Sequence, residues 1–174
     1  DAAIKGRSAS QMLLHRSLLT AAARAAGLAH GIVLWDIEAF YENCTPQAVV
    51  NATRKGFLPL GPTTLALFGH AQQRVFRWQS LFSNVVQPRS SVATGCVTSG
   101  SFSRGILHEP IQSVVDEAAK MEVEWASQQL QVAFMLLIDD FNTEASGTEE
   151  AVVESLVRLG LVFRDAVAEA GFTI

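Results

Sequence analysis

Residues 132–142 have the sequence VAFMLLIDDFN, in which seven apolar residues run without a break into Asp139 and Asp140. A continuous apolar run of this length predicts a strand that is buried on both faces. Charges at the end of a buried strand are costly unless a cation or a hydrogen-bond network neutralises them. A lone Asp-Asp pair is more often a solvated acidic turn, so this stretch needs a second observation before it indicates chemistry.

The second observation is the stretch HGIVLWD at residues 30–36, in which another apolar run ends in a carboxylate, Asp36. If the two strands lie side by side, Asp36 comes close to Asp139 and Asp140. Mg²⁺ prefers oxygen ligands and usually takes one or two carboxylates together with substrate phosphates. Pairs of such ions about 3.5–4 Å apart serve in-line phosphoryl displacement. The residues therefore predict a metal-dependent phosphoryl-transfer site.

The composition is that of a folded chain with an uneven distribution of charge. The 174 residues are 49% hydrophobic, with a mean hydropathy of +0.23 and a net charge of −4. Residues 1–104 carry ten basic and four acidic residues, whereas residues 105–174 carry three and thirteen. A basic first part suits a polyanionic partner, but the acidic total argues against a complete nucleic-acid-binding unit. The length corresponds to one domain or to a piece of a larger one.

The two cysteines, Cys44 and Cys96, have no CxxC or Cys/His spacing that would indicate zinc. We expect two reduced, buried thiols, which fit an intracellular protein, nuclear or cytoplasmic. No signal peptide is visible, and no apolar run approaches the roughly 18 residues of a membrane span.

Capping residues and glycines divide the chain into helices and strands. Ser8 and Gln11 have capping-box spacing for a first helix that Gly27 would end. Thr45 and Pro46 would start a second. The elements expected in order are helix 9–26, a strand to 36, helix 45–56, helix 62–74, a hairpin over 75–86, a helix to 127, strand 132–138, helix 146–170 and a strand from 171. This order predicts an α/β (α+β) layer with helices packed on one face of a single sheet, without a domain boundary.

Five of these stretches, taken in order, resemble the fingers-to-palm part of a reverse transcriptase. They are GRSA at residues 6–9, DIEAFYE at 36–42, GCVTS at 95–99, LIDD at 137–140 and AGFTI at 170–174. They resemble respectively the Gly-Arg-Ser element, the Asp-x-x-x-Ala-Phe-Asp motif, the Gln-Gly-x-x-x-Ser motif, the Tyr-x-Asp-Asp motif and the approach to the next palm motif. The similarity covers nearly the whole chain and is greatest to polymerases of non-LTR retroelements and group II introns.

The resemblance implies a polymerase palm-like sheet with catalytic aspartates at its strand ends and partial fingers. Residues 1–30 and 45–95 would be fingers-like, and residues 31–44 and 96–174 would form the palm. The thumb would be absent, so the chain would be a single fragment of a larger polyprotein or polymerase chain. Such a fragment is expected to be inactive by itself.

The activity that the resemblance implies is RNA-directed DNA polymerisation, in which deoxynucleotides are added to a primer 3′-hydroxyl. Asp36 and Asp139, with the Ile37 carbonyl, would hold two Mg²⁺ ions, Mn²⁺ being the alternative metal. Asp140 would be either a further ligand or a support for one. The partners would be an RNA template, a DNA primer and deoxynucleoside triphosphates, with no membrane.

Five further residues would contact the substrates. Tyr41 would exclude the ribose 2′-hydroxyl, with Phe40 as the competing candidate, unless both rings are core residues. Gly95 and Ser99 would let the backbone pass close to the nucleotide, or they simply form the entry to a helix. Arg7 would contact a phosphate, or it is a solvated arginine at a helix start.

The chain also departs from the family pattern. Glu42 stands in place of an aspartate, Phe40 in place of alanine, Thr94 in place of glutamine, and Leu137 in place of tyrosine or phenylalanine. Two alternatives stay open: the palm of an RNA-dependent RNA polymerase, whose Ser-Gly-x-x-x-Thr motif the pair Ser99-Gly100 resembles, and an inactive palm relic that acts as a binding module.

Overall fold

The computed structural model describes residues 9–87, 98–137 and 140–174. The chain forms two compact units, one of residues 1–38 and 107–174, which we call the sheet unit, and one of residues 39–106, which we call the helical unit. Residues up to 30, expected to be fingers-like, therefore belong to the same unit as the predicted palm strands. The helix α5 (Ser99–Glu124) contributes to both units.

The sheet unit is built on three antiparallel strands in the order β1-β5-β4. They are β1 (Ala29–Trp35), β4 (Gln131–Leu137) and β5 (Asp140–Gly147). The strands β1 and β4 were predicted, but β5 was not, because its small and polar residues carry a weak strand signal. Val132 to Phe134 of β4 are half-buried and not fully buried, since β4 has a neighbouring strand on one side only in this sheet.

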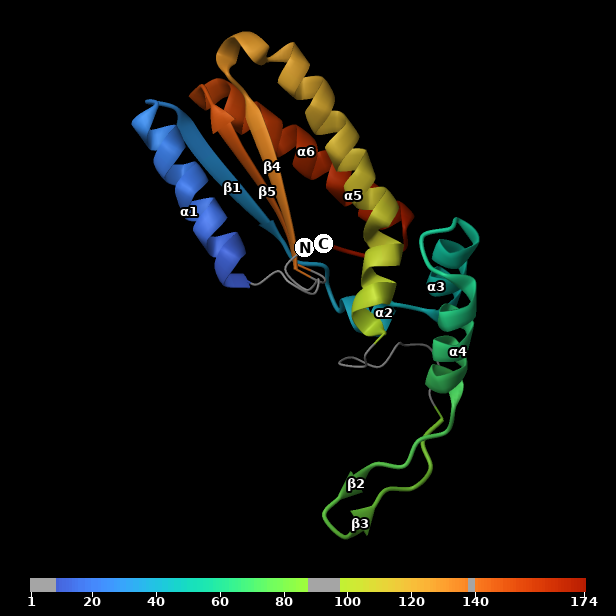
Figure 1. The fold of residues 1–174 in the computed structure, drawn as a ribbon. Helices are drawn as coiled ribbons and strands as arrows, with labels where there is room; N and C mark the ends of the chain where they lie inside the picture. Colours follow the sequence, from blue (N-terminus) through green and yellow to red (C-terminus); the bar gives the residue numbers. More distant parts are fainter. Residues whose placement is uncertain (1–8, 88–97, 138–139) are drawn as a thin grey trace. The chain divides into compact units, whose positions relative to one another are not determined.

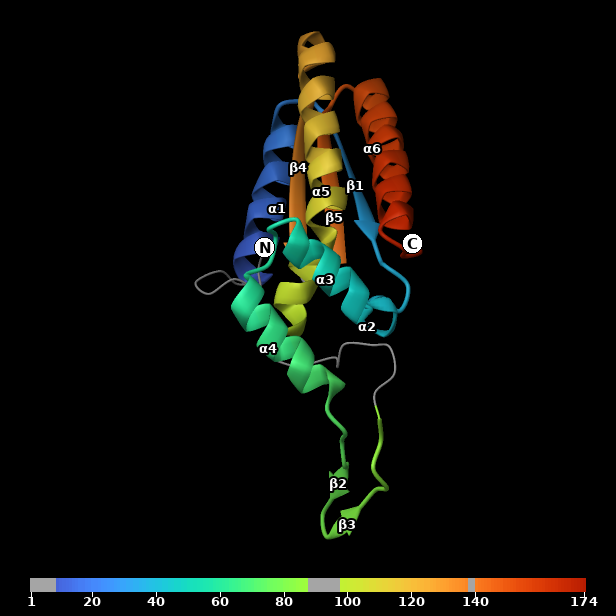
Figure 2. The ribbon, with the colours of Figure 1, turned by 90° about the vertical axis from the view of Figure 1, so that its right-hand side faces the viewer.

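Helices cover both faces of this sheet, so the prediction that they pack on one face was wrong (Figure 2). Side chains alternate along a strand, and on β5 Phe141 contacts Phe163 of α6 (Glu149–Glu169), with their ring centroids 4.6 Å apart. Glu144 lies on the opposite face, where it forms an ion pair with Arg16 of α1 (Ala9–Ala25). The sheet therefore has an α6 face and an α1 face.

The first helix ends where its glycine signal predicts, whereas the last helix begins two residues later than expected. The first helix ends before Gly27, whose φ of 71° is a left-handed conformation that glycine adopts without strain. The last helix is capped by Thr148, whose hydroxyl accepts a hydrogen bond from the Ala151 amide at 3.3 Å. The predicted cap, Ser146, is a residue of β5 instead. A short 3₁₀-helix, η1 (Ala126–Gln128), precedes β4.

Two glycines let α6 lie close to β1. A Cβ atom at Gly31 would lie 2.6 Å from a methyl group of Leu156, and one at Gly160 would lie 2.6 Å from the Trp35 ring. Such separations are well below contact distance, so larger residues at either position would force these side chains to move.

The predicted strand that begins at residue 171 is not formed. Gly171 has a φ of 89° and follows the end of α6. The next residues adopt no regular structure, although the Thr173 carbonyl accepts a hydrogen bond from the Glu38 amide at 2.9 Å.

The helical unit contains three helices, a hairpin and the beginning of α5 (Figure 1). Thr45 caps α3 by accepting from the Ala48 amide at 3.2 Å, and Gly56 has a left-handed φ of 85°, as the sequence predicts. The predicted hairpin is also present and is extended by a bridge between Arg74 and Val86. The elements are α2 (Phe40–Asn43), α3 (Pro46–Arg54), α4 (Leu60–Ala71), β2 (Arg77–Trp78) and β3 (Leu81–Phe82).

Candidate active site

The carboxyl end of β1 and the start of β5 lie at the same end of the sheet (Figure 1). Trp35, the last residue of β1, pairs with Phe141, and Leu137, the last residue of β4, pairs with Asp140. Asp36 follows Trp35 directly and Asp140 precedes Phe141 directly. The backbones of Asp36 and Asp140 therefore lie at the same end of two neighbouring strands.

Only residues 138 and 139 separate β4 from β5 in sequence. Asp139 lies outside the described residues, and the side chain of Asp140 is not described either. The convergence of three carboxylates on one ion therefore stays a prediction, although the strand order needed for it is present.

Asp36 itself is exposed, whereas the next residue, Ile37, is 3% exposed and belongs to the core. Its burial anchors the chain directly after Asp36 and leaves the carboxylate at the surface. Exposed carboxylates and a backbone carbonyl are hard oxygen donors of the kind that Mg²⁺ takes, so the chemistry of the predicted ligands fits the ion. Among the described residues, no three side chains of the metal-ligating kinds are grouped around one point.

The two aromatic candidates for sugar discrimination lie in the helical unit. Phe40 is 2% exposed and Tyr41 is half-buried, and the rings meet edge to face with centroids 5.4 Å apart. Phe40 is thus a core residue of the unit, and of the two rings only Tyr41 has appreciable accessible surface. Ala39, which precedes them, has a left-handed φ of 46°, a conformation that is unusual for a residue with a side chain.

Ser99 is the first residue of α5 and is 6% exposed. Near it, the Thr98 carbonyl accepts hydrogen bonds from the amides of Ser101 and Phe102 at 3.1 and 3.0 Å. This is a well-formed helix start, which was the alternative interpretation of the stretch. Gly95, Thr94 and Arg7 lie outside the described residues.

The thiol of Cys44 is fully buried and not in a disulfide, in agreement with the prediction for that residue. Burial raises its pKa to about 12, so it is protonated and unreactive at neutral pH. Cys96 lies outside the described residues.

The sequence reasoning missed a second group of functional interest, on the α1 face of the sheet. Glu144, 1% exposed, lies there with His30 and Arg16. The available signal was the alternation of residues 141–146, in which Phe141, Thr143 and Ala145 interleave with more polar side chains. Because no strand was predicted there, Glu144 was not assigned to a face.

Comparison with known proteins returned no match: no family model, no curated protein and no solved structure is similar to the chain. Within the part of the chain that the structure describes, no helix is both long and apolar enough to cross a membrane.

Proposed function

We propose that the chain is part of a reverse transcriptase, an RNA-directed DNA polymerase that extends a primer 3′-hydroxyl with deoxynucleotides. The observation that supports the proposal most directly is the register of β1 with β5. It brings Asp36, from one resembling motif, to the same sheet end as the start of β5, where the second acidic motif lies. The two motifs are about one hundred residues apart in the sequence.

In the proposed site, the carboxylates of Asp36 and Asp139 and the Ile37 carbonyl would hold two Mg²⁺ or Mn²⁺ ions, with Asp140 as a further ligand or a support. The ions, when bound, lower the pKa of the attacking hydroxyl and offset the charge that develops on the triphosphate. The protein's contribution would be to hold the acidic side chains at one end of a packed sheet. Ile37 and Phe141, which directly follow Asp36 and Asp140 in the sequence, are both buried.

In this proposal, Tyr41 determines that the enzyme makes DNA and not RNA. Its ring would occupy the space of a ribose 2′-hydroxyl and would thereby exclude ribonucleotides by a clash. Phe40 is less suited to the role, because its side chain is enclosed in the core of the helical unit. Ser99 and Gly95 would let the backbone pass close to the nucleotide, and Arg7 would contact a phosphate.

The experiment is primer extension on an RNA template by the full-length protein, with Mg²⁺ and with deoxynucleotides or ribonucleotides. We expect extension with deoxynucleotides, and we expect Asp139→Asn to abolish it, since a ligand charge is lost without a change in side-chain volume. Asp165→Asn is the matched control, because Asp165 is exposed on α6 and pairs only locally with Arg164 among the described residues.

Three outcomes separate the alternatives. Extension with ribonucleotides only would favour an RNA-dependent RNA polymerase. An absence of extension together with retained binding of primer and template would favour a palm relic acting as a binding module. Activity that survives Asp139→Asn would refute the proposed site.

A further inference from the structure

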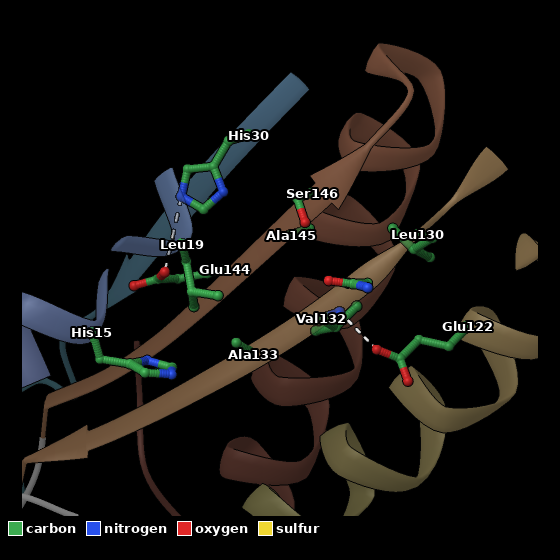
Figure 3. Close-up of a pocket in the computed structure, with 11 residues that line it drawn as sticks. His15, Leu19, His30, Glu122, Leu130, Val132, Ala133, Glu144, Ala145 and Ser146 are labelled. Carbon is green, nitrogen blue, oxygen red and sulfur yellow. Dashed lines mark hydrogen bonds and ion pairs between the residues drawn. The ribbon is translucent and has the colours of Figure 1, made fainter. Parts of the chain in front are cut away.

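A pocket with a volume of about 420 Å³ lies between α1 and the α1 face of the sheet (Figure 3). Its strand residues come from the start of β1, the start of β4 and the last part of β5, where His30 pairs with Ser146 and Ser146 pairs with Gln131. The pocket is therefore at the opposite end of the sheet from Asp36. Its volume falls within the usual range of small-molecule sites.

The pocket has a buried carboxylate with incomplete hydrogen bonding. The Glu144 side chain is 1% exposed, and its Oε1 atom lies 3.3 Å from Arg16 Nε. Its Oε2 atom lies 3.9 Å from His30 Nε2, and the His30 side chain is 11% exposed. The Arg16 contact has the distance of an ion pair but not the geometry of a hydrogen bond. Both carboxylate oxygens and both ring nitrogens of His30 consequently have no hydrogen-bond partner among the described residues.

Such groups are costly to bury, because an ionised carboxylate loses its hydration on burial and normally regains hydrogen bonds from the protein. Figure 3 shows Glu144, His30 and Leu19 turned toward the same space between α1 and the strands. The unpartnered atoms are mainly acceptors, since a carboxylate accepts only and a neutral imidazole accepts at one nitrogen. A ligand that matches them has to donate hydrogen bonds.

The net charge of the surrounding groups also favours a ligand that donates hydrogen bonds. Glu122, at the edge of the pocket, already accepts a hydrogen bond from the Val132 amide at 2.7 Å through its Oε1 atom. Among the described residues, Glu144 is paired with Arg16 and lies near His30, and Glu122 and His15 also line the pocket. With neutral histidines, this set retains one negative charge. The rest of the lining consists of five apolar residues and two polar ones, namely Leu19, Leu130, Val132, Ala133, Ala145, Gln131 and Ser146.

We propose that this pocket binds a small organic cation, a protonated primary amine on a short aliphatic body, whose ammonium group donates to Glu144. The ammonium neutralises the remaining charge and supplies the missing donors, and the aliphatic part covers Leu19 and Ala133. A bare metal ion fits less well, because the described residues contain no group of three ligating side chains. The proposal is independent of polymerase activity.

The experiment is a titration of the protein with butylammonium. Binding is monitored at each step through chemical-shift changes in the ¹H–¹⁵N spectrum of the chain. We expect saturable shifts centred on residues 130–133 and 144–146. Neutral butanol and anionic butyrate, which have similar aliphatic bodies, should bind at least tenfold more weakly, as expected for the loss of a charge-assisted hydrogen bond. Equal binding of the three probes, or no saturable shift with butylammonium, would overturn the proposal.

Variants test the role of the carboxylate. Glu144→Gln keeps the shape of the side chain and removes its charge, so it should weaken butylammonium binding roughly tenfold or more. Glu154→Gln, at an exposed position on α6, should leave binding unchanged. If Glu144→Gln does not fold, Leu19→Trp fills the pocket from α1 and leaves the carboxylate itself in place. Retained butylammonium binding in Leu19→Trp, or in a folded Glu144→Gln protein, would place the amine elsewhere and refute the proposal.

Discussion

The two faces of β5 are both buried, but they are buried in different ways. On the α6 face, Phe141 packs between Phe134 and Phe163, at centroid distances of 5.9 and 4.6 Å. On the α1 face, Glu144 is as deeply buried as Phe141 but has an arginine and a histidine as neighbours. One strand therefore carries an apolar interface on one side and a charged one on the other.

The contrast shows that burial by itself does not measure stabilisation. Removing an aromatic side chain from water is favourable in proportion to the apolar area buried. Removing a carboxylate from water is unfavourable until its charge and its lone pairs are matched. We therefore expect the α6 face to supply most of the stability of the sheet unit, and the α1 face to be held for another reason, such as the binding proposed above.

The largest effect is expected from Phe163→Ala on the α6 face. Phe163 is fully buried and its ring contacts both Phe141 and Trp35. The truncation should lower the free energy of unfolding by about 3–5 kcal/mol, because transfer energy is lost and a cavity is left. Urea denaturation measures the change. Val153→Ala, at an exposed position on the same helix, should change it little. If Phe163→Ala lowers the free energy of unfolding no more than Val153→Ala does, the result would contradict an aromatic core on this face.

A smaller effect is expected from Arg16→Gln on the α1 face. The change leaves the Glu144 carboxylate buried without its ion-pair partner, which should cost about 1–3 kcal/mol of unfolding free energy. The same denaturation experiment measures it. Arg164→Gln is the control, since Arg164 makes an exposed ion pair with its neighbour Asp165. If both changes cost the same, the Arg16 contact contributes no more than a surface pair.

The smallest effect concerns His70, a buried imidazole in the helical unit. Burial, and then the nearby charge of Arg74, lower its pKa below the ordinary 6.5. The folded unit therefore binds this proton less readily than the unfolded chain does, and its stability should fall as the pH drops from above 6.5 toward the lowered pKa.

Amide hydrogen exchange in α4, compared above and below the ordinary histidine pKa, measures this change. His70→Gln should remove the part of the pH dependence that comes from this group. A pH dependence that is the same in both proteins would show that His70 does not titrate differently in the folded unit.

Local signals accounted for much of the fold. The cap at Thr45, the left-handed glycines Gly27 and Gly56 and the two apolar strands could be predicted because each depends on neighbouring residues. The strand β5 could not, since residues 141–147 become a strand by pairing with β1 and β4 on either side. Its omission also moved the predicted helix start from Thr148 to Ser146.

For the candidate site too, some features could be predicted from the sequence and others depended on the tertiary structure. The sequence by itself determined that apolar strands would deliver Asp36 and the Asp139–Asp140 pair to strand ends, because hydrophobic runs and the charges that end them are local features. Only the tertiary structure decided that β1 lies antiparallel to β5 in a register that brings Asp36 to the same sheet end as Asp140. It also decided that α1 covers the second face of the sheet and encloses Glu144. Strand order and helix placement depend on contacts between residues about one hundred positions apart, and no local pattern carries that information.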